Sequence, residues 1–226
     1  MLSAAIFTFA QNQSDTKQNV RPGKVVETTH SANPTADGTL YSYEFTQPKF
    51  YVKHIVIKHD SLGHGTITFE RLNEEVPVQD PLELSPTALA RITALWTKLQ
   101  FLDSDTDYQS SQQFPHLGTM KIEMQRGDRK RTAEFNWTHN TDAAALVGEY
   151  RKASDQAIFV FDMSVARENQ PLNAPKLLES LESLLKRNGL SDPQQLLPLL
   201  RDVSTDEHLP LIARNQALRI MKLIQK

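Results

Sequence analysis

Two alternating segments joined by a glycine-containing turn constrain the fold of this chain more than any other feature. Apolar residues take every second position from 119 to 125, and the alternation returns from 130 to 137. A period of two is typical of a strand that buries one face. Between the segments lie Gly127 and Asp128, a pair suited to a two-residue hairpin turn because glycine readily takes a positive φ.

The turn also predicts the register of this hairpin. Met120 then faces Phe135 and Lys121 faces Glu134, so apolar side chains meet on one face and opposite charges meet on the other. A three-residue loop would instead place the two apolar sets on opposite faces. The predicted hairpin therefore has one apolar face, and another layer of the protein must cover it.

Three further strands are predicted upstream of the hairpin, at residues 40–46, 50–59 and 65–71. Across the loop between the last two, Ile57 would oppose Ile67, and Lys53 would oppose Arg71. The second pair brings two positive charges together, which is unfavourable unless the strands have splayed there. Residues 73–84 contain two prolines and several acids, and we predict an extended connector for them.

Two helices are predicted beside these strands. Ser85 and Pro86 are typical of a helix N-cap and first helical position, and apolar residues recur behind them at a spacing of three to four. That apolar stripe would pack on the apolar face of the sheet. A second helix is predicted from Thr141, either continuous to Arg167 or broken near Ser154.

The last part of the chain is predicted to be a helical tail. Leucines from 177 to 185 form an amphipathic stripe that ends at Gly189, a typical C-cap residue, and two further helices follow. The predicted organisation is a truncated signal segment plus disordered tether at 1–39, a sheet domain at 40–168 and the tail at 169–226. The predicted fold class is α+β, with a four- or five-stranded, mainly antiparallel sheet packed by helices and followed by a small α-helical tail.

Two stretches resemble known families. Residues 196–224 have a leucine-rich first helix, aspartates in the connection, and Arg214 followed by Ala217 in the second helix. In this they resemble a HEAT repeat, which implies a helical hairpin that packs on a neighbouring element. Residues 40–160 are similar in outline to small bacterial secreted domains of unknown function, through the order and spacing of GTITF at 65–69, LQFL at 99–102 and TMKI at 119–122. This second resemblance implies an α+β fold and an extracytoplasmic location, and it brings no catalytic residues.

Composition excludes several classes of function. The net charge of −2 creates no overall field that attracts nucleic acid or anionic lipid. The chain has no cysteine, which excludes disulfides, thiol catalysis and cysteine-ligated zinc. No apolar run approaches the ~20 residues that cross a membrane as a helix, so no membrane span is predicted.

The N-terminus indicates export. Residues 2–10 form a short apolar run, with Thr8 and Ala10 spaced like the small residues before a signal-peptidase cut. The basic segment that normally precedes such a run is missing, and a start codon assigned too far downstream would explain this. We predict a periplasmic or secreted protein. The alternative is a cytoplasmic protein with a short disordered or packed N-terminus.

One loop carries residue types that are used in catalysis and metal binding. His59, Asp60 and His64 could converge there, as a hydrolase-type acid–base site or as metal ligands. His54 and His59 differ by an odd number of positions, so they would face opposite sides of a regular strand. The other interpretation is that these are ordinary surface histidines. We predict no catalytic residue, no metal and no cofactor.

A stripe of apolar residues is a candidate partner surface. Phe50, Val52 and Val56 would point away from the apolar face of the sheet, together with His54. Either the C-terminal helices or a partner protein would have to cover such a stripe. The helical tail itself is a second candidate surface.

The tip of the central hairpin is basic. Arg126, Arg129 and Arg131 cluster there with Lys130, and a basic β-ribbon can enter a nucleic-acid groove. Asp128 interrupts the cluster, and the same charges would keep an edge hairpin soluble.

The favoured function is that of an exported, non-catalytic binding or protein-interaction module of unknown ligand. A protein partner is expected, and nucleic acid is not. The alternatives are a hydrolase-type enzyme that uses the His59–Asp60–His64 loop, and nucleic-acid binding through the basic tip at 126–131.

Overall fold

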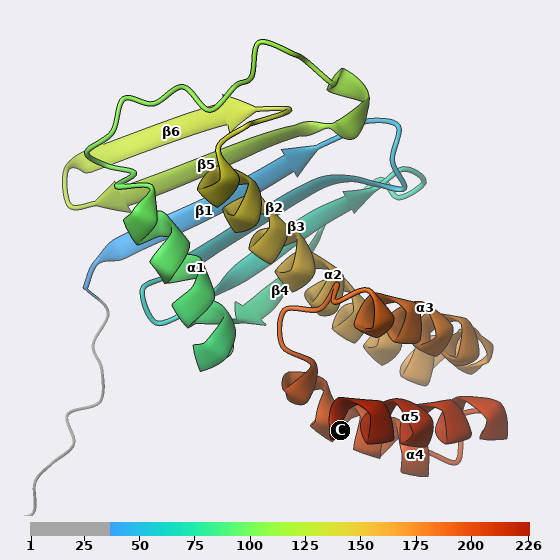
Figure 1. Ribbon diagram of the computed structural model, residues 1–226. Coiled ribbons are helices and arrows are strands. Elements are labelled where there is room, and N and C mark those ends of the chain that lie inside the picture. Colours follow the sequence, from blue (N-terminus) through green and yellow to red (C-terminus); the bar gives the residue numbers. More distant parts are fainter. Residues whose placement is uncertain (1–36) are drawn as a thin grey trace, which may run out of the picture. The chain divides into compact units, whose positions relative to one another are not determined.

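The computed structural model describes residues 37–226, and Figure 1 shows the arrangement of the elements. Six strands form one sheet in the order β4-β3-β2-β1-β5-β6, with every neighbouring pair antiparallel. They are β1 (Thr39–Thr46), β2 (Val52–Asp60), β3 (His64–Arg71), β4 (Val78–Glu83), β5 (Thr119–Arg126) and β6 (Arg129–Phe135). The α+β class is as predicted. The predicted signal run at 2–10, and the tether up to residue 36, lie outside the described residues.

The hairpin of β5 and β6 has the predicted turn and register. Met120 pairs with Phe135 and Lys121 pairs with Glu134. Gly127 has a φ of 57°, the left-handed conformation that a primed hairpin turn requires. Met120 and Phe135 are both buried, so the apolar face of the hairpin is covered.

The sheet has six strands, against the four or five predicted. The additional strand is β4, which lies within the segment predicted as an extended connector and pairs with β3. Pro81 sits inside it, opposite Thr66. A proline cannot donate to a ladder of backbone hydrogen bonds, but β4 is at the edge of the sheet, where this is tolerated.

A β-bulge in β2 corrects the predicted pairing of Lys53 with Arg71. Ile57 pairs with Ile67 as predicted, but the register shifts between Val52 and His54, so that Val52 pairs with Arg71. The like charges are thereby separated, and the Lys53 ammonium lies 3.3 Å from a Glu70 carboxylate oxygen. The extra residue of a bulge bends a strand locally and is left out of the ladder.

The bulge also corrects the predicted apolar stripe. Because one residue is inserted, Val52 lies on the same side of the sheet as Ile55 and packs against the main core. Val56 alternates with buried Ile55 and Ile57, and it therefore points to the opposite face. Phe50 precedes the strand, and its ring lies 6.0 Å from the ring of buried Phe45. The three residues thus do not share one face.

Two helices pack on the apolar side of the sheet, as the first core cluster shows (Figure 1). Helix α1 (Pro86–Lys98) begins at Ser85, whose hydroxyl accepts a hydrogen bond from the Ala88 amide at 3.1 Å. Of its predicted apolar stripe, Ile92 and Trp96 are buried, and Leu89 and Leu95 are partly buried against the same core. Helix α2 (Thr141–Asn169) is continuous over 29 residues, which decides between the two predicted forms. Short 3-10 turns, η1 (Pro115–Leu117) and η2 (Pro171–Asn173), precede β5 and follow α2.

The C-terminal tail is helical, with a hydrophobic cluster of its own. It consists of α3 (Ala174–Lys186), the 3-10 turn η3 (Pro193–Leu196), α4 (Leu197–Thr205) and α5 (Leu211–Ile224). Helix α2 joins both clusters: Leu146 and Tyr150 belong to the first, and Phe159 and Met163 belong to the second. Among residues 37–226, no helix is both long enough and apolar enough to cross a membrane.

Candidate functional site

A large groove opens on the helix-covered side of the sheet. We call it the apolar groove. It has a volume of about 950 Å³ and lies between strands β1, β2 and β5, the residues that follow β6, and helix α2. Most of its walls are apolar or aromatic, and these lining residues are Phe45, Phe50, Tyr51, Val52, Ile55, Leu117, Met120, Phe135, Trp137, Ala144 and Val147.

Three aromatic side chains on the rim of the apolar groove remain open to solvent. Phe50 is 45% exposed, Tyr51 61% and Trp137 40%. Phe50 and Tyr51 come from the turn between β1 and β2, and Trp137 follows β6. Of the predicted partner-surface residues, Phe50 and Val52 therefore line this groove, and Val56 does not.

Charged groups gather where α2 borders the apolar groove. Arg151 and Asp155 are one helical turn apart on α2, and Arg187 follows α3. The Arg151 guanidinium lies 5.6 Å from the centre of the Phe45 ring and donates to the Met120 sulfur at 3.4 Å. Burial raises the pKa of Asp155, and the positive charges of Arg187 and Arg151 oppose this.

A tyrosine lies beneath these charges. Tyr43 is fully buried, and its hydroxyl has no hydrogen-bond partner in the described residues. Burial raises the pKa of Tyr43 to about 12, while nearby Arg151 lowers it and Asp155 adds to the rise. The hydroxyl therefore lies close to the charged end of the groove. The sequence analysis found none of these four residues.

The serine and the threonine that line the apolar groove bond to the backbone. Its lining includes no histidine. The Ser154 hydroxyl donates to the Tyr150 carbonyl at 2.9 Å, and the Thr138 hydroxyl accepts from the Asn140 amide at 3.1 Å. Neither hydroxyl is paired with a base that could activate it as a nucleophile.

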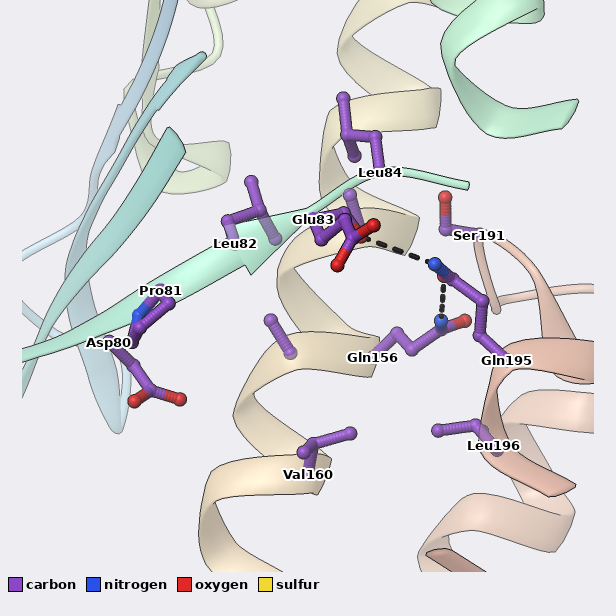
Figure 2. Close-up of a pocket in the computed structure, with 12 residues that line it drawn as sticks. Asp80, Pro81, Leu82, Glu83, Leu84, Gln156, Val160, Ser191, Gln195 and Leu196 are labelled. Atoms are coloured by element: carbon purple, nitrogen blue, oxygen red, sulfur yellow. Dashed lines mark hydrogen bonds between the residues drawn. The ribbon is translucent and has the colours of Figure 1, made fainter. Parts of the chain in front are cut away.

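A smaller cavity, of about 190 Å³, lies between β4, α2 and η3 (Figure 2). Two of its polar side chains bond to each other: Gln156 donates to Gln195 at 3.1 Å, and Gln195 donates to the Glu83 carbonyl at 3.3 Å, whereas the buried Ser191 hydroxyl has no hydrogen-bond partner in the described residues. Because the space is small, the cavity fits a junction between the sheet and the tail better than a ligand site.

The residues of the predicted hydrolase or metal loop, His59, Asp60 and His64, line one pocket of about 520 Å³, but no hydrogen bond joins their side chains in the described residues. His59 faces the core, where Nε2 lies 2.8 Å from the Tyr150 hydroxyl and Nδ1 lies 2.7 Å from the Asp60 carbonyl oxygen. The Asp60 carboxylate accepts from the amides of Leu62 and His64, at 2.9 and 3.0 Å, and so holds the turn. The His64 side chain is exposed. In the part of the chain that the structure describes, no cluster of three potential metal ligands is present.

Acid should weaken the fold through His59. Its ring stacks on Tyr41 at 5.0 Å and contacts Tyr150, and burial lowers its pKa below 6.5, against the opposing effect of Asp60. The unfolded chain therefore binds this proton at a higher pH than the folded chain does. The stabilisation is complete above about pH 6.5 and is lost as the pH falls through the folded pKa. Urea unfolding between about pH 8 and pH 5 measures this. His59→Gln should reduce the slope, and the exposed His64→Gln should not.

The basic side chains at the tip of the hairpin are engaged within the protein. Arg126 donates to the Thr39 hydroxyl at 2.7 Å, Arg129 to Asp103 at 2.5 Å, and Arg131 to the Phe101 carbonyl at 2.7 Å. Lys130 pairs with Glu123 at 2.9 Å. The geometry therefore gives no support to nucleic-acid binding at this tip.

The helical tail exposes apolar side chains on its last helix. On α5 these are Leu211, Ile212, Leu218 and Leu223. The prediction that the tail is a partner surface stays a prediction.

A scan against protein-family models and a search of curated proteins found no match to this chain. The two resemblances drawn from the sequence therefore remain predictions, and the geometry of the apolar groove has to carry the argument for function.

Proposed function

We propose that the protein is a non-catalytic binding module that holds the apolar part of a small ligand in the apolar groove. The groove's volume, about 950 Å³, carries this proposal. Small-molecule sites measure roughly 300–1,000 Å³ and are lined mainly by apolar and aromatic side chains with a few polar groups. The groove has this size and this lining.

The rim aromatics supply a driving force for binding. Phe50, Tyr51 and Trp137 are exposed although their ring surfaces are apolar. Covering apolar surface contributes about 25 cal/mol per Å², and aromatic side chains bury more surface than most. A ligand that lies against these rings therefore gains affinity without any change in the core.

The groove is largely formed before a ligand arrives. Two backbone hydrogen bonds close the turn that carries Phe50. The Phe50 amide donates to the Gln47 carbonyl at 3.0 Å, and the Gln47 amide donates to the Lys53 carbonyl at 2.8 Å. The Gln47 side chain also donates to the Pro115 carbonyl at 2.8 Å. A site held in this way loses little conformational entropy on binding.

Filling the groove should weaken binding. Nile red, an uncharged apolar dye, is expected to bind the wild-type protein with increased fluorescence. Ala144 is exposed on α2 and lines the groove, so Ala144→Trp should weaken dye binding about tenfold or more by occupying the space. Ala145→Trp is the matched control, because Ala145 is exposed on the same helix but does not line the groove.

The two tryptophans provide an internal check on this experiment. Trp137 lines the groove, whereas Trp96 is buried in the core at 1% exposure. Dye binding should quench the tryptophan fluorescence of the wild-type protein. In Trp137→Phe, where only Trp96 emits, the quenching should be much smaller. Equal dye affinity in the Ala144→Trp and Ala145→Trp variants, or no dye binding to the wild type, would contradict the proposal.

A further inference from the structure

We infer that the ligand of the apolar groove is an amphiphile with a carboxylate head, such as a long-chain fatty acid, and that Arg151 and Arg187 bind this head. The inference rests on the proposed function and adds the chemical class of the ligand. The apolar chain would lie against Phe45 and Met120, next to the charged end of the groove.

The groove has an excess of positive charge. Its charged lining residues are Lys49, Arg151 and Arg187 on one side and Asp155 on the other, which leaves two positive charges over. Buried Arg71 elsewhere in the fold contacts a carboxylate. In residues 37–226, by contrast, no carboxylate lies within ion-pair distance of Arg151 or Arg187.

Arginine is well suited to the proposed role. Its planar guanidinium presents several donors in a geometry that matches a carboxylate, and such charge-assisted hydrogen bonds are stronger than neutral ones. The apolar surroundings strengthen them further, because Arg151 lies over the Phe45 ring and against the Met120 sulfur. With a neutral head, Asp155 would be the one acidic side chain among the three cations that line the groove.

The buried Tyr43 hydroxyl is an independent observation that points to a polar ligand group. It makes no hydrogen bond of good geometry, and Arg151, the side chain that acts on it as a donor, cannot accept its proton; a buried hydroxyl without an acceptor is unfavourable. Arg151 and Asp155 both act on it, so it lies at the charged end of the groove. A carboxylate has oxygen atoms that only accept, and one drawn in by Arg151 would supply the missing acceptor.

Asp155 makes the inference testable in both directions. Arg187 and Arg151 lower the pKa of Asp155 against the effect of burial, so Asp155 interacts with both cations. A ligand carboxylate would compete with it for the same cations. Removing its charge should therefore tighten carboxylate binding, whereas removing an arginine should weaken it.

The experiment compares dodecanoate with 1-dodecanol, which have similar apolar chains and different heads. Each is titrated against protein-bound Nile red. Arg151→Gln and, separately, Arg187→Gln should weaken dodecanoate about tenfold, as expected for a lost hydrogen bond to a charged group. Both variants should weaken 1-dodecanol and the dye much less than dodecanoate, because neither carries a charged head. Asp155→Asn should strengthen dodecanoate several-fold and change the affinity for 1-dodecanol much less.

The outcomes separate this inference from the proposed function. Absence of dye binding to the wild type would remove both. If the wild type binds the dye but the arginine variants lose equal affinity for dodecanoate and 1-dodecanol, the inference of a carboxylate head is wrong and the proposed function stands. The same conclusion follows if the variants lose no affinity for either compound. The same holds if Asp155→Asn weakens dodecanoate. Circular dichroism of each variant confirms that it is folded, and two separate arginine variants keep the test available if one does not fold.

Discussion

Arg71→Ala should lower the free energy of unfolding by about 3 kcal/mol. Arg71 is 7% exposed, and its guanidinium bonds Asp162 on α2 and Glu74, the latter at 3.2 Å. Burial raises the pKa of Asp162 even with Arg71 beside it. Without the arginine, Asp162 would be left partly buried and uncompensated, which is the strongly destabilising way to break a buried pair.

A neighbouring ion pair provides the control for this prediction. Lys53 contacts Glu70 at 3.3 Å, and both side chains are about one-third exposed, at 33% and 31%. Pairs of this kind contribute roughly 0–1 kcal/mol, so Lys53→Ala should have little effect. Urea denaturation of both variants makes the comparison. Equal losses would mean that the contact between Arg71 and Asp162 does not stabilise the packing of α2 on the sheet.

A double variant separates the charge effect from the packing effect. Replacing Arg71 with Met and Asp162 with Leu removes both charges together, so neither is left uncompensated. Such apolar replacements of buried pairs are often neutral or stabilising. The double variant should therefore be more stable than Arg71→Ala, and the two substitutions should be non-additive because the residues are in contact.

Local sequence was sufficient where local interactions determine the structure. The hairpin register follows from the alternation around Met120 and Phe135 and from the glycine at 127, because turn type and side-chain period act within a few residues. The start of α1 follows in the same way from Ser85. These features need no knowledge of the rest of the chain.

The strand β4 and the bulge in β2 could not be predicted in this way. Whether Pro81 is tolerated in a strand depends on β4 lying at the edge of the sheet, which is a property of the whole sheet. The bulge moves Val52 to the helix-covered side, and the Arg71 opposite it contacts Asp162, 91 positions further along the chain. Interactions of this range leave no local pattern.

The site was missed for a related reason, but two signals were present. His59 is separated from Ile55 and Ile57 by even numbers of residues, so on a regular strand it lies on the same, buried face as they do and not in a reactive loop. Arg151 and Asp155 are four positions apart on a helix and so lie on one face. What the sequence could not show is that this face of α2 borders the same groove as Phe50 and Trp137.

Tyr150→Phe should lower the free energy of unfolding by about 2–4 kcal/mol, since it leaves two buried groups without partners. The Tyr150 hydroxyl accepts from the Trp96 indole at 3.0 Å and contacts His59 Nε2 at 2.8 Å. Neutral His59 with its proton on Nδ1 donates to the Asp60 carbonyl, which leaves Nε2 free to accept from Tyr150. One arrangement of protons therefore satisfies all three side chains, and the hydroxyl of Tyr150 is needed for each contact.

At the neighbouring Tyr43, the same substitution to phenylalanine should have the opposite effect on stability. Its ring stacks on Tyr150 at 5.1 Å, and both rings are fully buried, so Tyr→Phe removes one oxygen atom at either site. The Tyr43 hydroxyl makes no hydrogen bond of good geometry, although Arg151 lies near it; Tyr43→Phe should therefore be neutral or stabilising in the ligand-free protein, because it removes an unsatisfied polar group. Urea denaturation at about pH 7.5, above the range in which His59 titrates, compares the two variants. A loss for Tyr43→Phe as large as that for Tyr150→Phe would show that ring packing, rather than hydrogen bonding, accounts for the stability of this core.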